Sequence, residues 1–392
     1  MRLHQLVLLE AAGALLLVTW GADRALRVPA AVVAAVLVPV AVLRRRGRPA
    51  LEWCAVALAL RARLRAARGP WSAGGADPVL APLLECAGAL RTSTYRDRRR
   101  ERDIGMVGDG TFLTALLLVR PGDEPLRAAR EARALELGLL YEALEVDGVR
   151  LESAQVVQHT RPAPGPGLAE GAPAARSYAS LRAWAGAPAV RLTWIALRLD
   201  PGLCPDAVRA RGGGLGGAQR ALLRAADQVA GRLAAAGFDA RLLTEAQVVS
   251  ALAASAGVTV PAGPPQAGPA ASARRTAESR RAWRCDDRWH TTYAVGRRPR
   301  PGAGAADAAG AVALLVSGAA PVGTFSLTVS RGTGGAPAVS GHVRLTACDA
   351  RELAGAARRL ERAARGAGVG LVRLDREQLP GVLATLPLGG AR

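Results

Sequence analysis

Two long apolar runs open the chain. Leu6 to Ala22 carries a single charged residue, Glu10, and Ala25 to Leu43 carries only Arg27. Because about 17 to 20 apolar residues can cross a bilayer as a helix, the pattern predicts two transmembrane helices, a hairpin over residues 1–48. The alternative is a cleaved signal peptide followed by one stop-transfer helix, but the first run has no clean Ala-x-Ala site directly before the polar turn.

Arginines set the expected orientation of this hairpin. Eight arginines lie between the second run and residue 68, whereas the turn between the runs holds only Arg24 and Arg27. The positive-inside rule therefore predicts a multi-pass protein of the cell membrane with both termini in the cytoplasm. Residues 49–72 predict a basic interfacial helix that binds anionic lipid, with an ordinary linker helix as the alternative. The expected cytoplasmic-side membrane anchor is Arg44, Arg45, Arg46, Arg48, Trp53, Arg61, Arg63 and Arg65.

Beyond residue 72, short strand-like and helix-like patterns alternate, which predicts an α/β or α+β body. Segments 161–177 and 258–275 are rich in Pro, Gly and Ala and are expected to be linkers. They divide this cytosolic body into lobes at 73–160, 178–257 and 276–392. The expected strands are Ile104–Val107, Thr111–Val119, Val149–Val157, Val190–Leu199, Phe238–Leu243, Thr291–Val295, Phe325–Ser330, His342–Ala347 and Val369–Leu374. The expected helices are Leu126–Leu144, Ala218–Ala236, one opened by Thr244, Arg351–Arg365 and a short one after Asp375.

The last two lobes resemble each other. Residues Gln219–Ala253 align without gaps on Ala350–Ala384, with several identical residues on each side. Thr244 and Asp375 fall at equivalent positions, and both residue types are good N-caps. The sequence thus predicts an internal duplication of a helix–strand–helix unit.

Composition excludes several classes of function. The chain has 392 residues, a net charge of +20 and no lysine, so its 52 basic residues are all arginine. Without lysine there is no Walker A loop, Schiff base or lysine-dependent kinase site. The Ala, Gly, Pro and Arg bias is typical of GC-rich coding, so the charge does not by itself indicate a polyanionic partner. The five cysteines form no C-x-x-C pair and the four histidines are isolated, which predicts neither disulfides nor a metal site.

Three short patterns are candidates for chemistry. Gly212–Gly217 precedes a helix and could hold a phosphate, but a surface loop is the favoured interpretation. Asp286 and Asp287 could act as metal ligands or an acid–base pair, but Arg284 and Arg288 flank them and favour a local ion-pair cluster. The mixed charges of Tyr95–Asp103 favour a solvated face over a nucleic-acid site, because aromatic residues do not interleave with them.

A family resemblance is carried by the apolar pair, Arg44–Pro49 with Leu51–Trp53, Arg102–Thr111, and Leu374–Leu388. On these segments the chain resembles the EccE family, a membrane component of actinobacterial type VII (ESX) secretion machinery. The resemblance implies a non-enzymatic subunit beside EccB, EccC and EccD, without a cofactor of its own and with ATP hydrolysis left to EccC.

The sequence therefore leaves three functions open. The favoured one is a structural subunit of a type VII secretion complex in the cytoplasmic membrane. The alternative is a membrane-anchored, nucleotide-dependent transferase acting on envelope precursors, in which Asp286 and Asp287 would serve the nucleotide. A membrane-tethered nucleic-acid binder is the weakest, and no nucleic-acid partner is expected.

Overall fold

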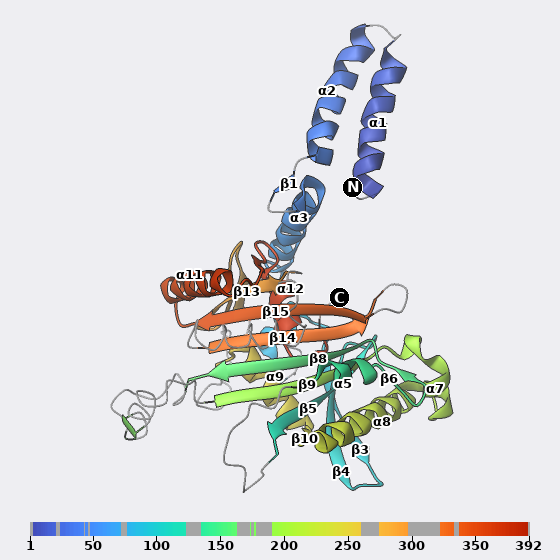
Figure 1. Cartoon of the computed structure of the whole chain (residues 1–392), viewed down its shortest axis with the longest axis vertical. Coiled ribbons are helices and arrows are strands. Elements are labelled where there is room, and N and C mark those ends of the chain that lie inside the picture. The colour runs from blue at the N-terminus through green and yellow to red at the C-terminus, as the bar shows by residue number, and fades with distance from the viewer. Residues whose placement is uncertain are drawn as a thin grey trace. The chain divides into compact units, whose positions relative to one another are not determined.

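In the computed structural model the chain forms two compact units, Met1–Gly69 and Pro70–Arg392 (Figure 1). The residues that the structure describes are 3–20, 24–42, 44–45, 48–71, 77–122, 135–162, 173, 176–177, 190–259, 274–296, 322–332 and 337–390. Most of the predicted linkers 161–177 and 258–275 lie outside these residues. So do residues 126–134 of the predicted helix Leu126–Leu144, whose described part contains α5 (Leu137–Glu142).

The N-terminal unit is a pair of antiparallel helices followed by a third. α1 (Leu3–Thr19) and α2 (Arg24–Val42) lie side by side (Figure 1). Ala12, Ala30 and Ala34 are buried in this unit, and such small side chains allow two helices to approach closely. β1 (Arg44–Arg45) and β2 (Arg48–Pro49) then form a short antiparallel pair before α3 (Ala50–Ala66).

The two predicted transmembrane helices, Leu6 to Ala22 and Ala25 to Leu43, are wrong. Among the described residues, no helix combines the length and the apolar character that crossing a membrane requires. α1 ends at Thr19 after 17 residues and α2 has 19 residues beginning at Arg24. α1 thus stops before the end of the first predicted span, and α2 has two arginines, Arg24 and Arg27, in its first turn. The multi-pass topology, and the orientation deduced from it, lose their basis.

The expected anchor residues are spread over two elements. Arg44, Arg45 and Arg48 belong to the β1–β2 pair, whereas Arg46 lies outside the described residues. On α3, Arg61 and Arg65 are exposed, and Trp53 and Arg63 are partly buried. Their contact with lipid remains a prediction.

The body is built on one twelve-stranded sheet, to which all three expected lobes contribute. Its strand pairs among the described residues are all antiparallel. The first half of the sheet contains β3 (Arg91–Asp97), β4 (Arg102–Gly108), β5 (Leu113–Pro121), β8 (Ser153–Arg161), β9 (Val190–Leu199) and β10 (Phe238–Leu242). The second half contains β11 (Thr276–Glu278), β12 (Trp283–Cys285), β13 (Arg288–Val295), β14 (Val322–Arg331), β15 (Pro337–Ala347) and β16 (Leu371–Arg373).

The two halves repeat one topology. The strand order is β3-β4-β5-β9-β8 in the first half and β11-β12-β13-β15-β14 in the second, with β10 paired to β5 and β16 paired to β13. β8 pairs with β14 antiparallel and joins the halves, so a twofold rotation about the middle of this pair exchanges them. The repeat seen in the sequence is the end of this larger one: helix, strand, helix occur as α8 (Gly214–Ala235), β10 and α9 (Glu245–Ala256), then as α11 (Ala350–Gly366), β16 and α12 (Gln378–Thr385).

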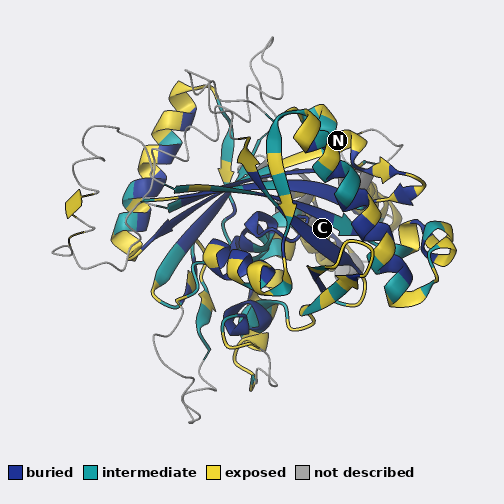
Figure 2. Ribbon diagram, turned by 90° about the horizontal axis from the view of Figure 1, so that it is seen from below, coloured by how far each residue is buried: buried dark blue, intermediate teal, exposed yellow. Residues whose placement is uncertain are grey.

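Helices cover both faces of the sheet, whose strands carry the most deeply buried residues (Figures 1 and 2). α8 packs on β5 and β9 through Ala221, Leu222 and Val229, while α11 packs on β13 and β15 through Leu353 and Leu360. α9 and α12 lie on the opposite face, where side chains from the same strands alternate outward. The small elements are α4 (Ala81–Cys86), β6 (Glu145–Val146), β7 (Val149–Arg150), η1 (Pro201–Leu203) and α7 (Pro205–Ala210).

Two local expectations can be compared with the structure. The charged run Tyr95–Asp103 forms the tight hairpin of β3 and β4 and is mostly exposed, as its mixed charges indicated, while half-buried Arg102 bridges Asp97 and Asp227 at 3.1 and 2.6 Å. Thr244 is the N-cap of α9, and its backbone N–H donates to Gln247. Asp375 is not an N-cap, because Glu377 takes that position in α12 and Asp375 pairs with Arg373.

The crossing of β4 and the start of α9 predicts a sharp glycine requirement. A Cβ on Gly105 would lie 2.5 Å from the Glu245 backbone nitrogen, and the Gly105 N–H donates to the Leu243 carbonyl. Gly105→Ala should therefore lower the free energy of unfolding by about 2 kcal/mol or more, measured by urea denaturation. Gly231→Ala in α8 is the matched control, because no atom lies within 4 Å of its added Cβ. The control should stabilise by about 0.5–1 kcal/mol; equal effects of the two changes would contradict the packing described.

Candidate functional site

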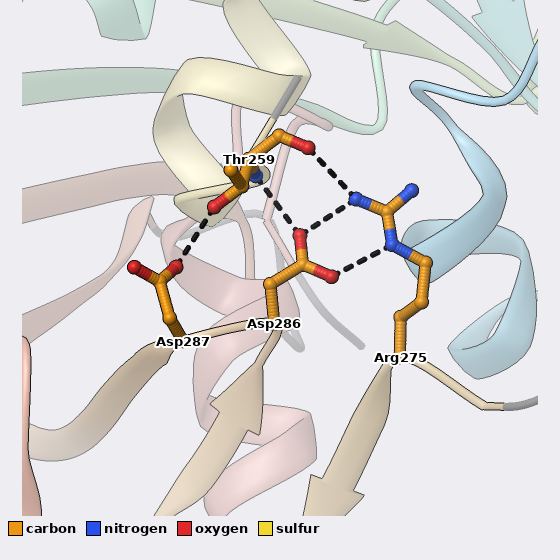
Figure 3. A pocket seen from close by; sticks show the side chains of 4 residues that line it. All are labelled: Thr259, Arg275, Asp286 and Asp287. Atoms are coloured by element: carbon orange, nitrogen blue, oxygen red, sulfur yellow. Dashed lines mark hydrogen bonds and ion pairs between the residues drawn. The ribbon is translucent and has the colours of Figure 1, made fainter. Parts of the chain in front are cut away.

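An open hollow of about 390 Å³ is lined by Thr259, Arg275, Asp286 and Asp287 (Figure 3). Asp286 and Asp287 form the turn between β12 and β13, and Arg275 directly precedes β11. Thr259 lies just beyond α9, where Gly257 ends the helix in the left-handed conformation at φ 70°. The hollow therefore lies where the chain leaving the first half meets the β12–β13 turn of the second half.

The centre of the hollow is a bidentate ion pair. Arg275 donates from Nε to Asp286 Oδ1 and from Nη2 to Asp286 Oδ2, both at 2.7 Å (Figure 3). The same guanidinium also donates to the Thr259 and Pro78 carbonyls at 2.9 and 3.0 Å. The hydrogen bond to Asp286 raises the pKa of Arg275, against the opposing effect of burial. Such paired geometry fixes direction as well as distance.

The remaining carboxylates complete this arrangement. Asp286 Oδ2 accepts from the Thr259 N–H at 2.9 Å, and Asp287 Oδ1 accepts from the Thr259 hydroxyl at 2.8 Å (Figure 3). Glu85 of α4 accepts from the backbone N–H groups of Arg275 and Thr276 at 2.7 and 2.9 Å. We call Glu85, Thr259, Arg275, Asp286 and Asp287 the polar clamp, because they tie α4, the end of α9 and the β12–β13 turn together.

The clamp refines what the sequence indicated for Asp286 and Asp287. The two residues do form ion pairs, but Asp286 pairs with Arg275, the last residue of the predicted linker 258–275, and Asp287 lies 3.5 Å from Arg288. In the described part of the chain, no group of three or more His, Cys, Asp or Glu side chains could hold a metal ion. Because Asp286 is engaged by Arg275 and Thr259, the geometry favours a structural role for this carboxylate over a general base.

A second cluster lies buried on the face of the sheet covered by α9 and α12. We call it the polar seam; it consists of Gln155, His159, His290, Thr292, Thr324, Ser326 and Arg344, all at most 4% exposed. Gln155 Nε2 and Ser326 Oγ both donate to the Ala384 carbonyl at 2.9 Å, in the last turn of α12. Arg344 donates to the Ser255 carbonyl in the last turn of α9. Polar strand residues thus satisfy carbonyls that helix ends leave unpaired.

The histidines of the seam are held neutral. His159 Nδ1 lies 2.9 Å from Thr324 Oγ1, and His290 Nδ1 lies 2.9 Å from Thr346 Oγ1. Burial, with a smaller contribution from Arg344, lowers the pKa of His159 to about 3, and the same causes lower the pKa of His290. In the sequence both histidines look isolated, because β8 and β13 are far apart along the chain. In the sheet, β14 and β15 lie between these two strands.

A second hollow, of about 320 Å³, lies at the β4–β5 turn, the twofold counterpart of the β12–β13 turn. Arg198 stacks on Phe112 at 3.6 Å and pairs with Glu152 at 2.8 Å. Gly389 N donates to Gln155 Oε1 at 2.8 Å, which fastens the segment beyond α12 beside this hollow. Two segments that carried the family resemblance, Arg102–Thr111 and Leu374–Leu388, meet here.

The Gly212–Gly217 loop is explained by backbone geometry. Gly212, Gly213 and Gly214 all have positive φ, at 95°, 66° and 55°, where α8 begins. Gly217 approaches Val208 so closely that a Cβ would lie 2.5 Å from the Val208 carbonyl oxygen. The glycines therefore serve a tight turn and close packing, and no phosphate role needs to be invoked for them.

The clamp predicts unequal roles for its two aspartates. The Asp286 side chain is 14% exposed and bidentate, whereas that of Asp287 is 60% exposed. Asp286→Asn should lower the free energy of unfolding by about 2 kcal/mol, because it leaves a half-buried guanidinium without its counter-charge. Asp287→Asn should change it by less than about 0.5 kcal/mol. Urea denaturation measures both, and a larger loss for Asp287→Asn would refute the assignment.

The seam predicts a pH dependence. The pKa of His159 is about 3 in the folded protein, against an ordinary 6.5. Between these two pH values His159 is protonated in the unfolded chain and neutral in the folded one. Its contribution to stability is complete above about pH 6.5 and is lost as the pH falls toward 3. Between pH 7 and pH 5 this residue alone should account for about 2 kcal/mol of lost stability. His159→Gln should reduce the difference in unfolding free energy between these pH values by that amount; an unchanged difference would show that His159 is not buried neutral.

Comparison with known proteins gives a family match for the central part of the chain. No curated protein matches the sequence. Residues 187–295, less than half of the chain, match the model of a family described as "EccE: Putative type VII ESX secretion system translocon". None of the segments that carried the resemblance in the sequence falls within this range; the match runs from β9 through α8, β10 and α9 to β13. The match points to a component of a type VII secretion system: over residues 187–295 the chain is similar to the EccE family.

Proposed function

We propose that this protein is a non-catalytic structural subunit of a type VII secretion complex at the cytoplasmic membrane, where it stabilises the core assembly. The observation that carries the proposal is the position of the family match. Residues 187–295 include four of the five clamp residues, Thr259, Arg275, Asp286 and Asp287, and they cross from the first half of the sheet into the second. The family likeness therefore lies on the part of the chain that joins the two halves of the body.

The chemistry of the clamp and the seam supports a structural role. A general base needs a carboxylate or imidazole that can reach substrate. Asp286 is held by Arg275 and Thr259, and His159 and His290 are buried with their pKa values lowered. Asp286 and His159 hydrogen-bond to neighbouring elements of the body.

Basic surfaces are the proposed contacts with partners. α11 exposes five arginines on the face away from its apolar side: Arg351, Arg358, Arg359, Arg362 and Arg365. On its twofold counterpart α8, Arg224 pairs with Asp147 and Arg232 pairs with Glu142. We therefore assign the α11 surface to an acidic face of a neighbouring subunit of EccB, EccC or EccD type. The basic residues of α3, including Arg61 and Arg65, are proposed to contact anionic lipid.

Co-purification tests the proposal. The full chain, tagged in its native host and extracted in mild detergent, should elute with other type VII secretion subunits. Arg358→Glu together with Arg362→Glu should lower the recovered partner by about tenfold or more, because like charges across an interface repel. Arg224→Glu together with Arg232→Glu on α8 is the matched control and should leave recovery unchanged.

The result that would overturn the proposal is equally concrete. A chain that elutes alone as a monomer, with or without the α11 changes, is not a subunit of an assembly. If the same monomer gained thermal stability from a nucleotide, and Asp286→Ala with Asp287→Ala abolished that gain, the transferase alternative would take its place.

A further inference from the structure

The polar seam contains a positive charge that the described residues do not balance. Arg344 lies in β15, three residues before the end of the strand, and is 0% exposed. Its Nη2 donates to the carbonyl and hydroxyl of Ser255 and contacts Thr324 Oγ1 at 3.4 Å, while Nε and Nη1 are buried without a partner. Among the described residues, none of the ion pairs involves Arg344.

The neighbouring groups cannot supply the missing charge. Burial lowers the pKa of Arg344 only to about 9, so the guanidinium remains protonated at neutral pH. His159 and His290 are neutral there, and burial raises the pKa of Cys285, which keeps its thiol neutral as well. The carbonyl end of α9 at Ser255 offsets part of one charge. An unpaired buried charge costs several kcal/mol, so a further anion would stabilise the fold.

Other unpartnered polar atoms gather beside Arg344. Thr292 on β13 is its direct cross-strand partner, and His290 lies two residues from Thr292, so its side chain points to the same face. The hydroxyl of Thr292 and Nε2 of His290 are both buried without a partner, like Nε and Nη1 of Arg344. All three residues are 0% exposed. If Nδ1 of His290 accepts from Thr346, Nε2 carries the proton and becomes a donor.

We propose that Arg344, His290 and Thr292 form a buried binding site for a small monovalent anion of the chloride class. The guanidinium supplies the charge, and the imidazole and hydroxyl supply two further donors from the adjacent strand. A halide needs only donors, whereas water in the same place would leave the guanidinium charge unbalanced. The site lies beside the end of α9 and under α12, so the anion links both helices to the sheet and stabilises the central region of the body.

The test is the halide dependence of thermal stability in the full chain. Replacing sodium gluconate by sodium chloride at constant ionic strength should raise the Tm by about 2–4 °C and saturate, as binding to the folded state requires. Bromide should act like chloride. Arg344→Met keeps the apolar volume and removes the charge, so its Tm should be the same in the two salts.

Arg198→Met is the matched control. Arg198 is also largely buried, but it has its own carboxylate in Glu152, so this variant should keep the full response to chloride. A Tm of the unsubstituted chain that is equal in chloride and gluconate would overturn the proposal. So would an Arg344→Met variant that keeps the chloride response.

A second measurement decides the matter if Arg344→Met fails to fold. Crystals of the unsubstituted chain grown in bromide should show an anomalous peak within hydrogen-bonding distance of Arg344 Nη1 and Thr292 Oγ1. Bound water at that position without anomalous signal, or a carboxylate from another part of the chain, would show that no halide site exists.

Discussion

The antiparallel pairing of β8 with β14 is the interaction on which the rest of the body depends. It extends from Ser153 opposite Ser330 to Thr160 opposite Gly323 and is the one place where the two halves of the described sheet share a backbone ladder. An antiparallel pair is self-complementary under a twofold rotation, so two copies of one topology can join there without leaving an unpaired strand edge between them. The halves then bury their apolar faces against separate helices, α8 on one and α11 on the other.

On the opposite face of the sheet, the backbone carbonyls at two helix ends need hydrogen-bond donors. α9 and α12 both end over the centre of the sheet, and their last carbonyls would be buried without partners if the strands beneath were apolar. The side chains of Gln155, Ser326 and Arg344 donate hydrogen bonds to these carbonyls. The polar residues at the middle of the sheet are therefore a consequence of where two helices end. The unbalanced guanidinium of Arg344 is the part of this solution that calls for an additional anion.

The polar clamp and the second hollow lie at equivalent positions of the two halves. In each, the chain leaving the last helix of one half crosses to a turn of the other half: Thr259 reaches Asp286, and Gly389 reaches Gln155 and the strands beside the β4–β5 turn. These reciprocal crossings add side-chain bonds to the backbone ladder of β8 and β14. A body held together in this way suits a subunit that must keep its shape while its charged surfaces contact neighbours.

The sequence by itself determined the local elements. Local apolar patterns located β9 and α8, the short runs Ile104–Val107 and Thr111–Val119 located β4 and β5, and the aligned segments revealed the repeated helix–strand–helix unit, because each element depends on residues close in the chain. It also misjudged the N-terminal runs, since counting apolar residues does not show that α1 ends at Thr19 and α2 begins at Arg24. Only the tertiary structure decided that the lobes share one sheet, that Asp286 pairs with Arg275, and that His290, Thr292 and Arg344 meet. Those contacts form between segments distant in sequence, and strand order and register, which no local pattern encodes, bring them together.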